Sequence, residues 1–142
     1  MSAAPAPPEV MESYLLSVRA DPRRREVIFT FRPPEGEHEF GLRAGGVEEL
    51  VMNEFLHQNI VHEIRVSGRH SNPPDVRDLL ASLLFDKKDA SEVVEPTFLT
   101  RLEDCTVAVL EERRILLEIE PVSGASVLLL AESVEWLEPN RP

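Results

Sequence analysis

Apolar and polar residues alternate along several stretches of this chain, which is the pattern of strands that bury one face. In the first half the alternation covers residues 14–20, 27–32, 37–43 and 60–67. Asp21-Pro22 separates the first two stretches and is a typical turn start, because proline fixes φ at the second turn position. We therefore predict a hairpin that the third strand extends into a meander.

The stretch from Cys105 to Trp136 has the pattern of an antiparallel ribbon. Residues 106–110, 115–120 and 126–131 are predicted strands, with one turn around Glu112-Arg113 and another at 123–125. The segment Val127-Leu-Leu-Leu130 is apolar at every position. A strand that is apolar on both faces is expected to be covered on both sides.

Helical spacing is clearest after Asn72-Pro73, where one apolar stripe is formed by Val76, Leu79, Leu80, Leu83 and Leu84. Asn72 is a candidate cap, and Pro73 suits the first helical position, so we predict a main helix at about 73–85. Phe98, Leu99 and Leu102 follow Pro96 and predict one or two helical turns. Residues 47–56 fit both periods, and we assign them to a short helical turn.

These elements predict an α+β fold. It consists of a mostly antiparallel, strongly curved sheet of about six or seven strands, one main helix and one or two short helical turns. Apolar residues also occupy the second face of the strands, at Leu15, Ile28, Val61, Leu116, Leu128 and Leu130. A single helix cannot cover that face. Either the sheet curls to enclose it, or a second copy in a homodimer covers it.

The length of 142 residues fits one domain, which we place at residues 11–139. Residues 1–10, rich in proline and alanine, are expected to form a flexible arm, and residues 140–142 a short tail. The chain has a single cysteine, no signal-like start and no apolar run of the roughly 20 residues that a membrane span needs. We expect a cytoplasmic protein without a disulfide framework.

The net charge is −11 and is unevenly distributed. Residues 1–88 have 11 basic and 14 acidic side chains, net −3, whereas residues 89–142 have 4 basic and 12 acidic ones, net −8. Such a field disfavours nucleic acid and anionic membranes as partners. It favours either solubility alone or a basic protein partner.

No set of residues converges on a recognisable chemistry. His57 and His62 are five positions apart, which places them on opposite faces of a strand and about 140° apart on a helix. Cys105 follows Asp104, and an acidic neighbour does not activate a thiol. Arg23 to Arg25 are expected at a solvated hairpin tip. We therefore predict no catalytic residues, no metal and no cofactor.

The function we predict is non-enzymatic protein binding, with an inhibitor or immunity-type protein that masks a basic partner as its specific form. The candidate partner-binding residues are Glu111, Glu118, Glu120, Glu132 and Glu135 in the acidic ribbon, and Asn53, His57 and Asn59 in a loop. One alternative is a small-molecule-binding or enzymatic pocket near His57 and His62. The other is a structural homodimer subunit of an assembly.

Overall fold

The computed structural model describes residues 11–35 and 38–137, and within them the chain forms one antiparallel sheet and two α-helices. The elements in chain order are β1 (Tyr14–Asp21), β2 (Glu26–Arg32), β3 (Phe40–Gly45), β4 (Glu49–Asn53), β5 (Ile60–Ser67), α1 (Pro73–Phe85), the 3-10 turn η2 (Ala90–Glu92), α2 (Pro96–Leu110), β6 (Ile115–Ser123), β7 (Ser126–Ala131) and β8 (Ser133–Leu137). The predicted α+β class is confirmed, with eight strands in place of six or seven. The predicted arm (1–10) and tail (140–142) lie outside the described residues.

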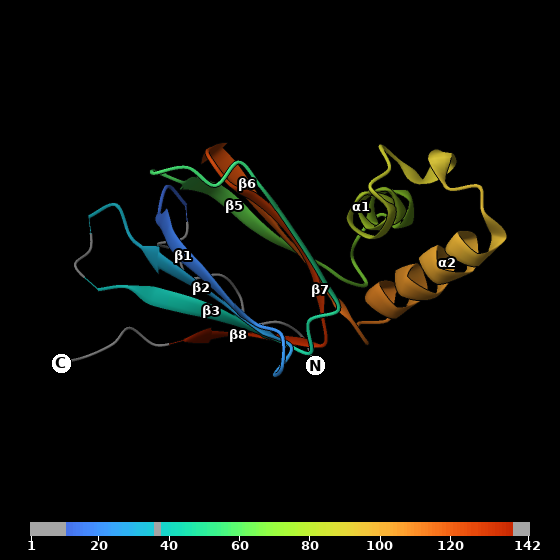
Figure 1. Cartoon of the computed structure of the whole chain (residues 1–142), viewed down its shortest axis with the longest axis horizontal. Coiled ribbons are helices and arrows are strands. Elements are labelled where there is room, and N and C mark those ends of the chain that lie inside the picture. The colour runs from blue at the N-terminus through green and yellow to red at the C-terminus, as the bar shows by residue number, and fades with distance from the viewer. Residues whose placement is uncertain (1–10, 36–37, 138–142) are drawn as a thin grey trace.

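The strand order is β4-β7-β6-β5-β1-β2-β3-β8, and Figure 1 shows the sheet folded into a V, with β2, β3 and β8 on one arm and β5, β6 and β7 on the other. The bend arises where β3 leads into β4 and β7 leads into β8. There the amide of Glu132 donates to the carbonyls of Gly45 and Gly46. Gly46 has a φ of 63°, and a Cβ at this position would lie 2.6 Å from the Glu132 side chain. The corner therefore favours glycine.

The inner side of the V is the main apolar core. Phe29, Phe31 and Ile119 are fully buried there, and the aromatic rings of Phe31 and Phe40 stack at 5.2 Å between centroids. These residues belong to the alternating positions that predicted the strands. The curl of the sheet encloses this face without closing a barrel.

The helices cover part of the outer side of the sheet, next to β7 (Figure 1). Leu116 and Leu130 point outward from β6 and β7 into a second cluster with Val76, Leu80 and Val109 of the helices. This arrangement explains the continuous apolar run in β7, because the strand lies between the core and the helices. None of the described helices is long and apolar enough to cross a membrane.

The ribbon prediction is wrong at its first strand. Residues 106–110 form the last turn and a half of α2, so the turn around Glu112-Arg113 joins a helix to β6. Within α2 the buried positions include Leu102, Thr106 and Val109, at helical spacing, and the Thr106 hydroxyl donates to the Leu102 carbonyl at 2.7 Å. The predicted turn at 123–125 does join β6 to β7.

Three smaller predictions also need correction. Residues 47–56 contain strand β4 and no helical turn, because the segment pairs with β7 from Glu49 to Asn53. Asn72 precedes α1 as predicted, and Pro73 is its first residue, but the Asn72 side chain makes no capping hydrogen bond. Residues 96–110 form a full second helix where only one or two turns were predicted.

Candidate acidic groove

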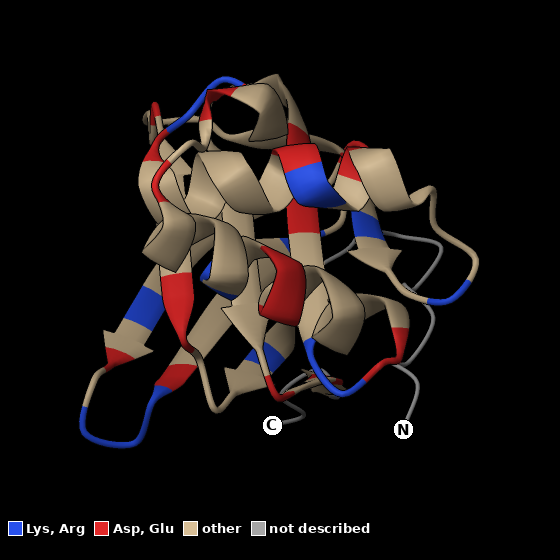
Figure 2. Ribbon diagram, turned by 90° about the vertical axis from the view of Figure 1, so that its right-hand side faces the viewer, with Lys and Arg blue, Asp and Glu red and all other residues tan. Residues whose placement is uncertain are grey.

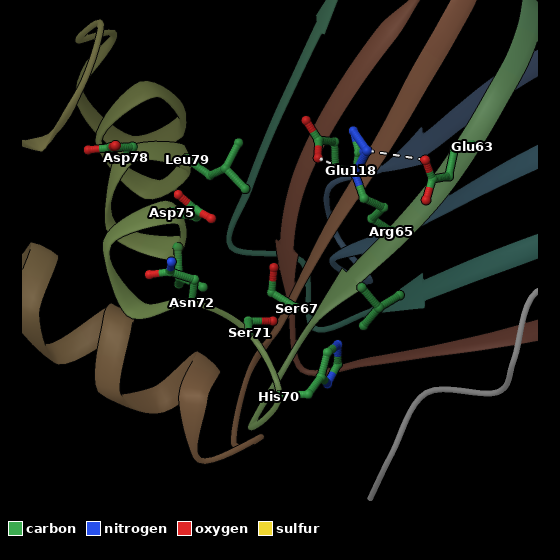
Figure 3. A pocket seen from close by; sticks show the side chains of 12 residues that line it. Glu63, Arg65, Ser67, His70, Ser71, Asn72, Asp75, Asp78, Leu79 and Glu118 are labelled. Carbon is green, nitrogen blue, oxygen red and sulfur yellow. Dashed lines mark hydrogen bonds and ion pairs between the residues drawn. The ribbon is translucent and has the colours of Figure 1, made fainter.

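A groove of about 740 Å³ separates the outer face of β5 and β6 from the N-terminal half of α1 (Figure 3). Strand β5, the loop that leads from it into α1, and α1 itself form the groove together with β6, which follows much later in the chain. The lining residues are Glu63, Arg65, Val66, Ser67, His70, Ser71, Asn72, Asp75, Val76, Asp78, Leu79 and Glu118. Arg65 is the one Lys or Arg among these described lining residues, so the groove carries an excess of negative charge.

The pairing of β5 with β6 positions the strand side of the groove. Arg65 pairs with Glu118 and Glu63 with Glu120, so four charged side chains lie in two neighbouring cross-strand pairs on the outer face. The Arg65 Nε donates to Glu118 Oε1 at 3.2 Å, and its Nη1 donates to Glu63 Oε2 at 3.2 Å. The Nη2 donates to Glu120 Oε2 at 2.8 Å. One guanidinium therefore donates hydrogen bonds to three carboxylates.

The helix contributes one carboxylate that faces the strands. In Figure 3 Asp75 projects from the first turn of α1 into the groove, beside Leu79. Asp78 points away from the groove, and its Oδ1 accepts a hydrogen bond from the amide of Ala90 at 2.9 Å. Asp75 is thus the carboxylate of α1 that is available to a ligand, while Asp78 connects α1 to η2.

The predicted acidic residues do not form one surface. Glu118 and Glu120 are brought together by Arg65, but the other three candidates pair with different arginines elsewhere. Glu111 pairs with Arg113 at 3.0 Å, Glu132 lies 4.0 Å from Arg25, and Glu135 pairs with Arg43. Of the five predicted glutamates, Glu118 alone lines the groove, and Glu120 is connected to it through Arg65. The other charged lining residues, Glu63, Arg65 and Asp75, were not among the predicted partner-binding residues.

The predicted loop candidates have different roles. Asn59 is 3% exposed, and its side chain holds the loop together, whereas Asn53 and His57 are exposed. The Asn59 Oδ1 accepts hydrogen bonds from the amides of Leu56 and Ala125, and its Nδ2 donates to the Leu56 carbonyl. Asn59 is a structural residue of this loop.

His62, Glu63 and Glu120 are the described residues close enough to share a cation, with one ligand atom from each within 4.8 Å of the others. His57 does not join them. A register shift around Val61 leaves His62 exposed. Because the Arg65 guanidinium already pairs with Glu63 and Glu120, a metal would have to compete with it for both carboxylates.

The groove does not hold a nucleophile paired with a base among its described lining residues. The Ser71 hydroxyl accepts a hydrogen bond from the amide of Gly68 at 2.9 Å, and His70 points away from both Ser71 and Asp75 in Figure 3. Cys105 lies on α2, where burial raises the pKa of its thiol and disfavours the reactive thiolate.

The arginine-rich tip of the first hairpin projects from the body as a basic loop between Asp21 and Glu26 (Figure 2). The Asp21 Oδ1 accepts hydrogen bonds from the amides of Arg23 and Arg24, as the predicted turn implies. Neither arginine lines the groove.

Compared with protein-family models, curated proteins and solved structures, the chain matches none of them.

Proposed function

We propose that this protein is a non-enzymatic binding domain whose acidic groove receives a lysine- or arginine-bearing segment of another protein. One observation carries the proposal: the guanidinium of Arg65 serves three carboxylates, and Asp75 faces the same groove from α1. A second cation placed between α1 and β6 would meet carboxylates from both sides.

The Arg65 cluster itself is a bound guanidinium, held by the same kind of contacts that a partner's arginine would make. Because the cluster retains an excess of negative charge, a further cation gains attraction without displacing Arg65. The net charge of −11 adds a long-range field that speeds the approach of a basic partner. These properties suit an inhibitor or immunity-type protein that masks a cationic surface.

A small cationic molecule is a second candidate ligand, because about 740 Å³ lies within the usual range of roughly 300–1,000 Å³ for ligand pockets. The two candidates differ in the area that they require. A protein segment would contact the strands beyond the groove, whereas a diamine would contact the groove alone.

The proposal is tested with a fluorescent nine-residue peptide that carries arginine at alternate positions, and with a counterpart that carries glutamate there. Anisotropy at about 0.05 M and about 0.3 M salt gives both affinity and its screening. We expect binding of the arginine peptide that weakens with salt. Replacing one carboxylate from each side of the groove, Asp75→Asn with Glu118→Gln, is expected to weaken binding about tenfold, equivalent to about 1.4 kcal/mol.

The matched control is Asp104→Asn with Glu95→Gln, which removes two exposed carboxylates outside the groove, one on α2 and one at its N-cap. It reduces the overall charge without altering the groove. Equal affinity for the wild type and the groove variant, or an equal loss in the control, would contradict the proposal. Reversal by Glu118→Lys with Glu120→Lys is expected to abolish capture at low salt.

Arg65→Met provides a test in the opposite direction. Removing the internal guanidinium frees three carboxylates, so the affinity for the arginine peptide should rise several-fold. Weaker binding in this variant would mean that Arg65 holds the three carboxylates in place. It would rule out competition between Arg65 and a ligand cation for these carboxylates. Circular dichroism confirms that each variant is folded before the comparison.

A further inference from the structure

We propose that a divalent transition metal ion, represented by Zn²⁺, binds to His62, Glu63 and Glu120 on the outer face of β5 and β6. These side chains offer one nitrogen and two carboxylate oxygens, all within 4.8 Å of one another. The metal site adjoins the acidic groove, but it is separate from the proposed function, because its ligand is an inorganic ion and it needs no partner protein.

A β-bulge brings two consecutive residues of β5 to the same face. The pairing with β6 advances by two residues on β5, from Val61 to Glu63, while β6 advances by one, so His62 is the extra residue. Val61 and Ile64 both pack on the inner core, and the two residues between them face outward. In a regular strand, neighbouring residues point to opposite faces. The bulge therefore allows His62 and Glu63 to hold one ion.

Glu120 completes the set from β6. It lies directly opposite Glu63 in the strand pairing, and it follows Ile119, which is fully buried on the inner side. Two carboxylates in direct opposition repel each other unless a cation lies near both of them. Arg65 supplies one positive charge, and Figure 3 shows its side chain between Glu63 and Glu118.

The charge of Arg65 does not balance this cluster. Three carboxylates, those of Glu63, Glu118 and Glu120, pair with one guanidinium, so three negative charges and one positive charge leave a formal charge of −2. A divalent cation would neutralise it. Arg65 bonds the Oε2 atom of Glu63 and of Glu120, and the Oε1 atoms lie outside these bonds. Each carboxylate thus has one oxygen for Arg65 and one for a metal.

The His62 ring is available as the nitrogen ligand. It is exposed, and it makes no hydrogen bond or ion pair with any other residue that the structure describes. Ligand atoms around a tetrahedral Zn²⁺ lie about 3.4 Å apart. The side chains of Glu63 and Glu120 are 45% and 42% exposed, so small rotations about their χ angles can bring the three ligand atoms to this spacing.

The ligand set determines the class of ion. An imidazole nitrogen suits Zn²⁺ and its neighbours in the first transition row, whereas Mg²⁺ and Ca²⁺ prefer sites built from oxygen ligands alone. Three protein ligands leave a further coordination position for water. A bound ion would connect β5 to β6 at the bulge and stabilise the folded chain, because the unfolded chain does not hold these ligands together.

Calorimetric titration of the metal-stripped, full-length protein with Zn²⁺ tests the site. We expect binding at one site, which His62→Ala and Glu120→Gln should each weaken at least about tenfold. The matched control is His57→Ala, which removes an exposed histidine outside the cluster and should leave the affinity unchanged. An excess of Mg²⁺ should not displace the zinc.

NMR of the histidine rings identifies the nitrogen ligand in the wild-type protein, without any variant. The ring signals of His62 should shift on addition of Zn²⁺, and those of His57 should not. Absence of zinc binding would overturn the proposal. Binding that His62→Ala leaves unchanged, or that Mg²⁺ abolishes, would also overturn it, because the acidic surface in general would then hold the ion. The titration contains no peptide, so its failure would leave the proposed function intact.

Discussion

The two sides of the same sheet differ in what covers them. Inside the V, apolar side chains from both arms enclose one another, and Phe29, Leu117 and Ile119 are at most 1% exposed. Outside, α1 and α2 cover Leu116 and Leu130 but stop short of the paired charges around Arg65. Few substitutions of the buried side chains on the inner side are tolerated without loss of the fold. The charged side chains on the uncovered outer side are accessible to a partner.

This difference separates stability from recognition. Burial of apolar area stabilises the curled sheet, and each large side chain removed from it leaves a cavity. The exposed ion pairs around Arg65 add little stability, because exposed pairs typically contribute about 0–1 kcal/mol. We interpret the outward charges as a surface for binding.

The largest expected effect compares two phenylalanines, one enclosed within the V and one exposed in the loop between β4 and β5. Phe29→Ala, at 0% exposure, should lower the free energy of unfolding by about 3–5 kcal/mol. Phe55→Ala, at 45% exposure, should change it by no more than about 0.5 kcal/mol. Urea titration followed by circular dichroism measures both, and similar losses in the two variants would contradict the division into an enclosed and an open side.

An intermediate effect is expected at the loop between β4 and β5. Asn59→Ala removes three hydrogen bonds of a buried side chain and leaves the amides of Leu56 and Ala125 without that acceptor, which should cost about 1–3 kcal/mol. Asn53→Ala, at an exposed position, is the control and should be close to neutral. A neutral Asn59→Ala variant would show that the loop does not depend on this residue.

The smallest effect tests the helical structure of residues 106–110. Its sign is informative, because one substitution should stabilise a helix and destabilise a strand. Val107 is 44% exposed on α2, so Val107→Ala should stabilise the protein by about 0.5 kcal/mol, because alanine favours a helix more than valine does. If residues 106–110 formed a strand, the same change would destabilise it. Thermal unfolding of the two proteins in parallel distinguishes the two signs.

Most of the sheet follows from local alternation, but α2 does not. Thr106-Val-Ala-Val-Leu110 consists largely of β-branched residues that alternate in size, which predicts a strand over five positions. The helical period appears only over a longer window, through Leu99, Leu102, Thr106 and Val109. Packing against α1 then outweighs the local preference.

The groove was only half visible in the sequence, because its residues meet through strand pairing and helix packing. Glu118 and Glu120 were identifiable from their shared face on one strand. Arg65 and Asp75 depend on the register of β5 with β6 and on the position of α1, which no local pattern determines. The one signal in the sequence was that Glu63 and Arg65 alternate with apolar Ile64 and Val66.

The most direct test of the central claim is a backbone amide NMR titration of the uniformly ¹⁵N-labelled protein with the arginine peptide. We expect chemical-shift changes concentrated on β5, β6 and the first turns of α1, around Arg65, Glu118 and Asp75, that decrease with added salt. Changes confined to the far face of α2 or to the tip at Arg23 to Arg25, or no changes at all, would contradict it.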